Sequence, residues 1–392
     1  MNTYDVTRNV LLYRIHVIFN EPLFWGAVLI DSLQRLAHMS LPDIYYMESV
    51  VLVLCVALDV PAGVLADLIG RKKCLIMGRM FLLVDTYLFA SMQTPADAWT
   101  ANVLWAIGFA LQSGADSALL RDSLGEVRRE HEFKEIAGKS VGGRYLLMAL
   151  CALAIGPLAT IHPRLPFYLG LPFMALPLIA VCFLKEPAAT TAAHPIEKMK
   201  LLQQGCRAAL HSAEVRWMVG LAALLATTSK VWFFTYNPYF ELVGLPLTQY
   251  GVIFFCLNIV AWLSSRYAVG IERHLGERAC IIGMVLCLGA PIMLMAAVPI
   301  QAFAYLVVIQ NVVRGFMMPF VQDYLNRHIK SSVRATVLSV QSSFANLMAI
   351  VALASFGFLT GTLGLLPSLM LLGFSVTILG TWSYVTYVKK VA

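Results

Sequence analysis

The sequence has 392 residues, of which 59% are hydrophobic and only 13% charged, with a net charge of +7 and a mean hydropathy of +0.74. Soluble proteins carry about 25% charged residues, so this composition excludes a soluble enzyme, a disordered protein and a nucleic-acid binder. A transmembrane helix needs about 20 apolar residues, and long apolar runs such as Ala279–Val298 therefore predict a multi-pass α-helical membrane protein.

The hydropathy pattern predicts twelve membrane spans in chain order. Their expected ranges are 10–34, 44–66, 74–93, 99–121, 139–161, 165–184, 215–240, 246–269, 279–298, 301–325, 334–359 and 364–388. The polar segment 185–214 is the longest connection, and it divides the chain into an N-terminal six-helix bundle (1–184) and a C-terminal six-helix bundle (215–392) joined by a cytoplasmic linker. The expected fold is all-α.

Basic residues fall mainly on one side of the predicted membrane. Of the 29 Lys and Arg, 22 lie in or next to one set of connections, Arg35 and Arg164 lie on the opposite side, and five lie within spans. The positive-inside rule then places both termini in the cytoplasm and the chain in the cytoplasmic (inner) membrane. This topology accounts for the positive charge, so no nucleic-acid partner is expected.

The connection between the second and third spans carries a recognisable motif. Residues 59–73 read Asp59-Val-Pro61-Ala-Gly63-Val-Leu65-Ala-Asp67-Leu-Ile-Gly70-Arg71-Lys72-Lys73. This segment resembles the signature of the major facilitator superfamily in position, spacing and topological side. The end of the fourth span, at Leu119-Leu120-Arg121-Asp122, and the segment 334–339 resemble bacterial exporters of that superfamily. The resemblance implies two pseudo-symmetric bundles, with a central cavity lined mainly by spans 1, 4, 7 and 10.

The motif residues have physical roles that suit a cytoplasmic gate. Gly63 and Gly70 permit close helix approach and a tight turn, and Asp67 can accept backbone N–H groups at a helix end. Arg71 is expected to pair with Asp122 on a neighbouring helix, which makes a contact that can form in one state and separate in another. The predicted gating residues are Asp59, Gly63, Asp67, Gly70, Arg71 and Asp122. The alternative is an ordinary basic loop that only sets topology.

The second half repeats this pattern weakly at an offset of about 206 residues. Gly276-Glu277-Arg278-Ala279-Cys280 corresponds to residues 70–74, but the Asp-x-x-Gly-Arg order is lost. The fourth span also lacks the Arg of many proton-coupled members of the superfamily, and the fifth-span antiporter motif is only partial, at Ala154–Pro157. These two departures weaken the case for proton antiport.

Ionisable residues inside the spans are functional candidates because charges are costly in a bilayer. Glu21, between Asn20 and Pro22, is the first candidate for carrying a proton, followed by Asp59 and Asp116. The expected substrate-binding residues, which are polar or aromatic and near the middle of spans, are Asn20, Glu21, Lys230, Trp232, Tyr236 and Arg314. The alternatives are structural hydrogen bonds, an Asp116–Arg144 salt bridge, lipid-facing aromatics, and pairing of Lys230 and Arg314 with backbone, Gln310 or Asn311 away from the path.

The charges also suggest a substrate class. In the second half of the chain, Lys230 and Arg314 lie near the middle of their membrane spans without an equally central acid, and a buried cation needs a partner. The sequence thus predicts a small organic solute with an anionic or zwitterionic group on an apolar body.

The sequence lacks the motifs typical of nucleotide hydrolysis, nucleophilic catalysis and metal binding. It contains no phosphate-binding G-x-x-x-x-G-K-[ST] loop, no G-x-S-x-G elbow and no Cys/His cluster with metal-ligand spacing, so no enzyme activity, cofactor or metal is expected.

The leading hypothesis is a secondary transporter, acting as a monomer among membrane lipids, that exports a small molecule with protons as the coupling ion. The alternatives are a symporter or facilitator that imports a nutrient, a non-transporting scaffold or sensor on the same fold, and a membrane-embedded enzyme.

Overall fold

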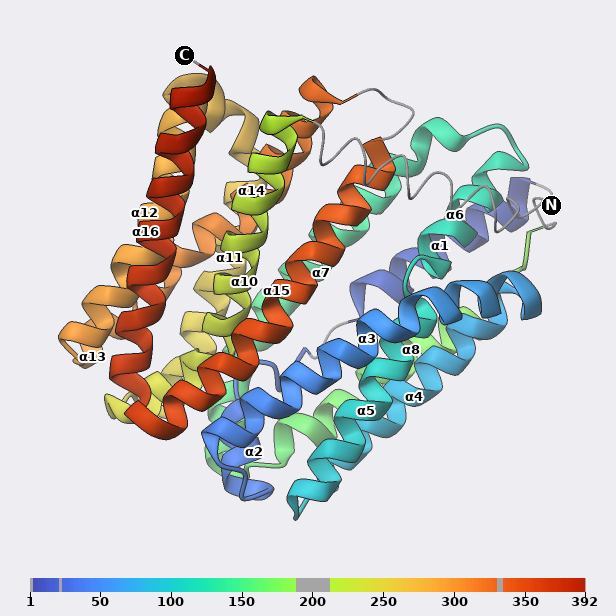
Figure 1. Ribbon diagram of the computed structural model, residues 1–392. Helices are drawn as coiled ribbons and strands as arrows, with labels where there is room; N and C mark the ends of the chain where they lie inside the picture. The colour runs from blue at the N-terminus through green and yellow to red at the C-terminus, as the bar shows by residue number, and fades with distance from the viewer. Residues whose placement is uncertain (1–2, 21–22, 188–211, 330–333, 392) are drawn as a thin grey trace. The chain divides into compact units, whose positions relative to one another are not determined.

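The computed structural model describes residues 3–20, 23–187, 212–329 and 334–391, and the regular structure within these ranges is helical (Figure 1). In chain order the helices are α1 (Thr3–Ile18), α2 (Leu29–Leu36), α3 (Leu41–Ile69), α4 (Arg71–Ser91), α5 (Pro95–Gln112), α6 (Ala115–Gly125), the 3₁₀ turn η1 (Glu130–Glu132), α7 (Phe133–Ile161), α8 (Leu165–Cys182), α10 (Ala213–Leu242), α11 (Leu247–Leu275), α12 (Glu277–Ala297), α13 (Gln301–Ala304), α14 (Val307–His328), α15 (Arg334–Leu363) and α16 (Leu365–Val391).

Within the described residues, eleven helical segments are long and apolar enough to cross a membrane. They correspond to the second through twelfth predicted spans, so the all-α, multi-pass architecture is confirmed. The first predicted span, 10–34, covers the end of α1 and most of α2, with residues 21–22 outside the described part of the chain.

Three spans that the hydropathy pattern predicts as single helices are interrupted. The first divides into α1 and α2, next to a proline at position 22 whose missing N–H disfavours a continuous helix. The fourth divides at Gly114, whose φ of +75° lies in the left-handed region and cannot continue a right-handed helix. The tenth divides into α13 and α14 around Tyr305. Interrupted spans leave backbone groups outside the helical ladder, and such positions are tolerated at membrane depth where protein or water satisfies those groups.

The chain forms two compact units. Unit 1 comprises Met1–Ser40, Val50–Ala192 and Leu247–Phe255, and unit 2 comprises Leu41–Ser49, Ala193–Pro246 and Cys256–Ala392. The first residues of α3 therefore pack within unit 2, and the first residues of α11 pack within unit 1. The division of the membrane bundles at residues 184 and 215 stays a prediction.

Small residues bring helices close together in each unit. In unit 1 a Cβ added to Gly78 of α4 would lie 2.8 Å from the carbonyl oxygen of Gly108 on α5, and one added to Gly108 would lie 2.8 Å from the Gly78 carbonyl oxygen. In unit 2 Gly289 of α12 faces Gly373 of α16, and these two helices lie side by side in Figure 1. Glycine at such positions is typical of membrane helices, where backbones approach closely to gain van der Waals contact.

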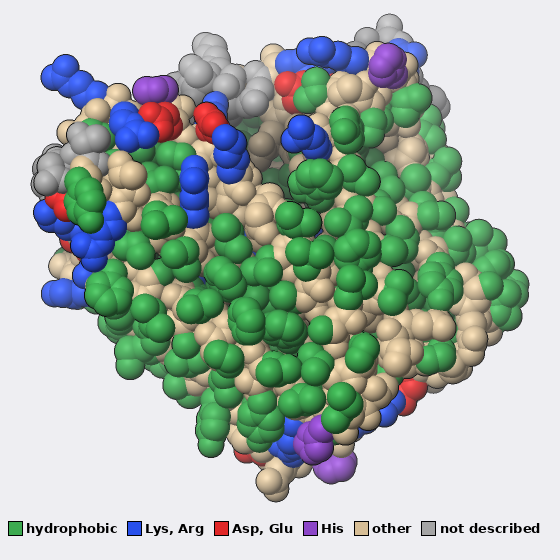
Figure 2. Space-filling view, turned by 180° about the vertical axis from the view of Figure 1, so that it is seen from behind, with side chains coloured by type: hydrophobic (Ala, Val, Ile, Leu, Met, Phe, Trp, Pro, Cys, Tyr) green, Lys and Arg blue, Asp and Glu red, His purple; other side chains and the backbone are tan. Residues whose placement is uncertain are grey.

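Large hydrophobic side chains are exposed along the helices. Leu68 of α3, Val351 of α15 and Trp382 of α16 have exposed fractions of 76%, 65% and 66%. Figure 2 shows hydrophobic side chains over most of the visible face, with Lys and Arg gathered towards its upper and lower edges. An apolar surface of this extent is unfavourable in water and matches a lipid environment.

Candidate functional site

The ion pair that the sequence motif predicts connects the turn between α3 and α4 to α6. Gly70 adopts a φ of +101°, which a residue with a side chain rarely adopts, and this confirms the tight turn expected there. Arg71 is the first residue of α4, and its guanidinium Nη1 donates to the carboxylate Oδ2 of Asp122 on α6. The pair is partly exposed and connects two helices of unit 1 at the end of the motif.

Glu186, which follows α8, belongs to the same cluster and is absent from the sequence prediction. Its carboxylate Oε1 accepts the backbone N–H of Arg71 and its Oε2 accepts that of Lys72, both at 2.8 Å. These N–H groups begin α4 and have no partner within the helix, so the carboxylate caps the positive end of the helix dipole. The signal in the sequence is the acid in Lys185-Glu186-Pro187, directly after the sixth span.

The other motif residues lie along the exposed side of α3. Asp59, Gly63 and Asp67 are all exposed. A Cβ added to Gly63 would meet no described heavy atom within 4 Å, so the close helix approach expected at this glycine is wrong for this structure. The physical reason is its position on the outer face of α3 in unit 1, where no described segment packs.

The predicted proton-carrying residues are only partly described. Glu21 lies outside the described residues, and Asn20 is half-buried just after α1. Asp116 lies in the first turn of α6 and interacts electrostatically with Arg79 and Arg144, which is consistent with the alternative of a structural role for Asp116.

Arg79 differs most from its sequence-based assignment. The sequence places it among the basic residues of the cytoplasmic connections, whereas its side chain is fully buried on α4. Its Nε donates to Nδ1 of His16 at 3.2 Å, and its Nη2 donates to the His16 carbonyl oxygen, also at 3.2 Å. His16 is therefore part of a buried polar contact with a cation.

Unit 2 contains a buried acid that the sequence motifs do not indicate. Glu48 on α3 is 9% exposed and is attracted electrostatically by Lys230 on α10. Two hydrogen bonds hold this part of α3 in place: the hydroxyls of Tyr45 and Thr235 lie 2.7 Å apart, and Ser49 donates to the carbonyl oxygen of Ile350 on α15 at 2.9 Å. Lys230 therefore has an acidic neighbour within the protein, and an anionic group on the substrate stays a prediction. Glu48 was detectable as an acid inside the predicted span 44–66.

The aromatic candidates of α10 come together with α14. Trp232 is fully buried, and its ring packs edge-on against Tyr236 with centroids 5.6 Å apart. The Nδ2 of Asn311 on α14 donates to the Tyr236 hydroxyl at 3.0 Å, and Arg314, one turn further along α14, interacts electrostatically with Tyr236. Three of the predicted substrate-binding residues thus lie near one another in unit 2.

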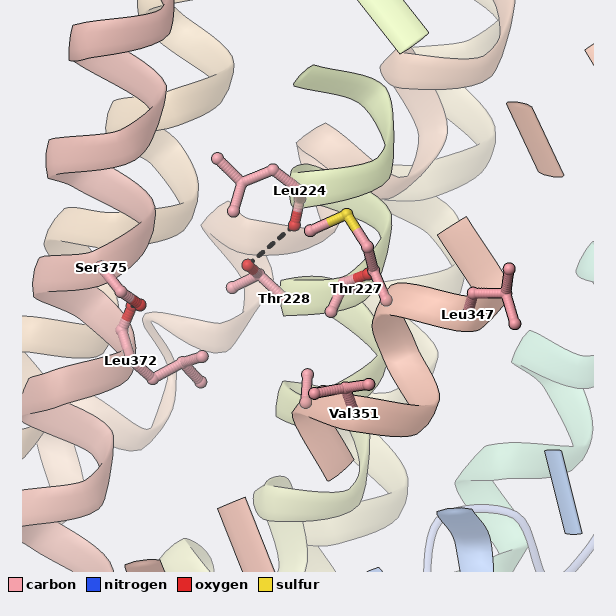
Figure 3. Close-up of a pocket in the computed structure, with 9 residues that line it drawn as sticks. Leu224, Thr227, Thr228, Leu347, Val351, Leu372 and Ser375 are labelled. Atoms are coloured by element: carbon pink, nitrogen blue, oxygen red, sulfur yellow. Dashed lines mark hydrogen bonds between the residues drawn. The ribbon is translucent and has the colours of Figure 1, made fainter. Parts of the chain in front are cut away.

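A pocket of about 470 Å³ lies between α10, α15 and α16 (Figure 3). Its polar lining groups already bond to backbone oxygens: Thr227 to Ala345 at 3.3 Å, Thr228 to Leu224 at 2.9 Å and Ser375 to Leu372 at 2.8 Å. The rest of the lining is apolar, so the pocket is suited to lipid hydrocarbon rather than to a polar solute.

A second charge cluster lies where α11, α12 and α14 meet in unit 2. The guanidinium of Arg327 on α14 reaches Glu272 at 2.6 Å, Asp323 at 3.2 Å and Glu277 at 3.5 Å. Glu277 is the first residue of α12, as Arg71 is the first residue of α4. Among the residues that the structure describes, no group of three or more His, Cys, Asp or Glu is arranged to hold a metal ion.

These features match a known family of membrane transporters. The family model of the Major Facilitator Superfamily matches residues 15–353, and the chain belongs to this superfamily. A similar curated protein is an uncharacterised MFS-type transporter, YxaM, of Bacillus subtilis (strain 168), which is 22% identical over 324 residues covering 78% of each chain.

Solved structures show the same fold at low identity. The crystal structure of the D323A mutant of the nucleoside transporter NupG is 11% identical with a TM-score of 0.78, over 96% of this chain and 99% of that one. A bacterial homologue of the human lysosomal transporter Spinster, solved in an inward-facing and unoccupied conformation, is 14% identical with a TM-score of 0.76, over 97% and 96% of the two chains.

Proposed function

We propose that this chain is a secondary active transporter of the cytoplasmic membrane that exports a small organic solute by alternating access, driven by the proton gradient. It acts as a monomer with both termini in the cytoplasm. Its membership of the transporter superfamily and the bias of basic residues to one side of the spans support this proposal. The sequence contains no phosphate-binding loop for ATP hydrolysis, so a gradient is the expected energy source.

The observation that carries the proposal is the Arg71–Asp122 pair, together with Glu186 at the start of α4. Three separate segments meet there through polar contacts at partly exposed positions, beside a buried apolar cluster that includes Leu75, Leu119 and Leu184. Contacts of this kind have small net free energies because water competes for the same groups. They therefore suit a lock that forms and separates in each transport cycle.

Proton coupling is assigned to acids within the spans. Glu21 is the first candidate, and Glu48 joins it because it is a buried carboxyl group next to Lys230. A buried carboxyl group near a cation can lose and regain a proton when its surroundings change, and this couples proton movement to conformation.

The test is transport by the purified full-length protein in proteoliposomes, with a panel of metabolites and drugs and with or without an imposed pH gradient. We expect uphill movement of at least one solute that requires the gradient and is lost when the gradient is dissipated. Downhill movement unaffected by the gradient would favour a facilitator, and no transport of any solute would favour a scaffold or sensor; either result would reject the proposal.

A further inference from the structure

The interior of unit 2 contains polar side-chain atoms without hydrogen-bond partners among the described residues. Gln310 on α14 is 2% exposed, and neither its Nε2 nor its Oε1 has a partner. Asn311 is 1% exposed, and its Oδ1 is also without one. On α10, the indole Nε1 of the fully buried Trp232 also has no hydrogen-bond partner among the described residues.

Asn311, Tyr236 and Trp232 are connected through their side chains. Asn311 donates through Nδ2 to the Tyr236 hydroxyl at 3.0 Å, and the Tyr236 ring packs against Trp232. Gln310 directly precedes Asn311 in the sequence. Both lie about one helical turn before the exposed Arg314 on α14. We call Gln310, Asn311, Trp232 and Tyr236 the amide cluster.

Buried polar groups in native proteins are almost always hydrogen-bonded, because an unmade bond costs folding free energy. A core position with no polar role is better filled by Leu or Met. Two adjacent buried amides with unused bonding capacity therefore point to another molecule that completes their bonds.

We infer that the amide cluster is a binding subsite for a neutral, planar group that presents a hydrogen-bond donor and acceptor side by side, as carboxamides, lactams and nucleobase edges do. A Gln side chain offers one acceptor and two donors in a plane, so only a group with both functions satisfies it. A carboxylate has acceptors alone and leaves Oε1 unsatisfied, whereas an ammonium has donors alone and leaves Nε2 unsatisfied. This inference rests on the proposed transport function and replaces the anionic substrate group predicted from Lys230.

The test measures the thermal unfolding midpoint of the purified full-length protein in detergent. The probes are uracil, nicotinamide and nicotinate; the last two share a ring and differ in having a carboxamide or a carboxylate. We expect saturating uracil or nicotinamide to raise the midpoint by about 2 °C and nicotinate to leave it unchanged. The gain should disappear in Gln310→Met, which keeps an unbranched side chain of similar size.

The same variant separates a binding role from a structural one. Without a probe, Gln310→Met should unfold at the same or a higher temperature than the original chain, because it removes unsatisfied polar atoms; Gln310→Leu provides a second variant for the same comparison. Thr228→Val is the matched control, since that hydroxyl bonds within its own helix, and it should keep the response to nicotinamide.

Three results would overturn the inference: equal stabilisation by nicotinate and nicotinamide, no stabilisation by either amide probe, or a lower midpoint of both Gln310 variants without a probe. Binding is measured here without transport, so a failure of this subsite is distinguishable from a failure of the proposed transport function.

Discussion

The guanidinium Nη1 of Arg327 lies 3.5 Å from Oε2 of Glu277, and this pair carries its charges in the opposite order from Arg71 and Asp122. Glu277 and Arg71 each begin a helix directly after a glycine with positive φ, and their partners, Arg327 and Asp122, lie just after the end of the next predicted span, 301–325 or 99–121. The second-half segment 276–280 has lost the Asp-x-x-Gly-Arg order but therefore retains an ion pair with the two signs exchanged. Coulombic attraction is unchanged by such an exchange.

Exchanging the charges of Arg327 and Glu277 tests whether this ion pair acts in transport regardless of the order of its charges. Arg327→Glu leaves four acidic side chains close together and should slow transport in proteoliposomes several-fold through like-charge repulsion. Adding Glu277→Arg restores an opposite-charge pair and should recover part of the rate. A double variant no faster than Arg327→Glu alone would show that the order of charges matters for another reason.

The first pair is expected to control turnover rather than insertion. Arg71→Ala and Asp67→Ala should give normal amounts of protein in the membrane but slower transport, because the cytoplasmic lock no longer closes. The measurement is the initial transport rate per inserted molecule. Lys73→Ala is the control from the same turn, since Lys73 is exposed, and it should be close to normal. Normal rates in both test variants would refute the gate.

Glu186 should contribute to stability through the start of α4. Its carboxylate holds two backbone N–H groups, and loss of a comparable helix cap costs about 1 kcal/mol. Glu186→Ala is therefore expected to lower the thermal unfolding midpoint, with Glu186→Gln intermediate because an amide oxygen still accepts one of the bonds. Glu135→Ala, which removes an exposed surface ion pair with Lys139, serves as the control and should have a smaller effect.

Glu21 is expected to carry the coupled proton. Glu21→Gln should abolish uphill transport driven by a pH gradient while leaving exchange of substrate measurable, because a glutamine keeps the shape of the side chain but cannot release a proton. The measurement compares counterflow with gradient-driven uptake in the same vesicles. Retained uphill transport with unchanged pH dependence would remove Glu21 from the mechanism.

Hydropathy predicts the long helices because burial in lipid requires about 20 apolar residues, a constraint that is local in sequence. It misses the interruption at Gly114, because left-handed backbone at one residue leaves hydropathy unchanged. The Arg71–Asp122 pair was predictable from a motif with fixed spacing. In contrast, the burial of Arg79 and the position of Glu48 beside Lys230 depend on which helix face packs inward, and that is decided by contacts between segments far apart in the chain.

The Glu48–Lys230 interaction leads to the last prediction, which concerns pairs of substitutions. Removing one of two opposite charges that attract each other leaves the other uncompensated and lowers stability, whereas replacing both by neutral side chains is often close to neutral. Glu48→Gln and Lys230→Met should therefore each lower the unfolding midpoint of the purified protein, and the double variant should unfold closer to the original chain than either single variant does. Additive losses in the double variant would show that the two groups do not interact. If Glu48 also takes part in coupling, the double variant should be stable yet unable to use a pH gradient, and this outcome separates its role in transport from its role in stability.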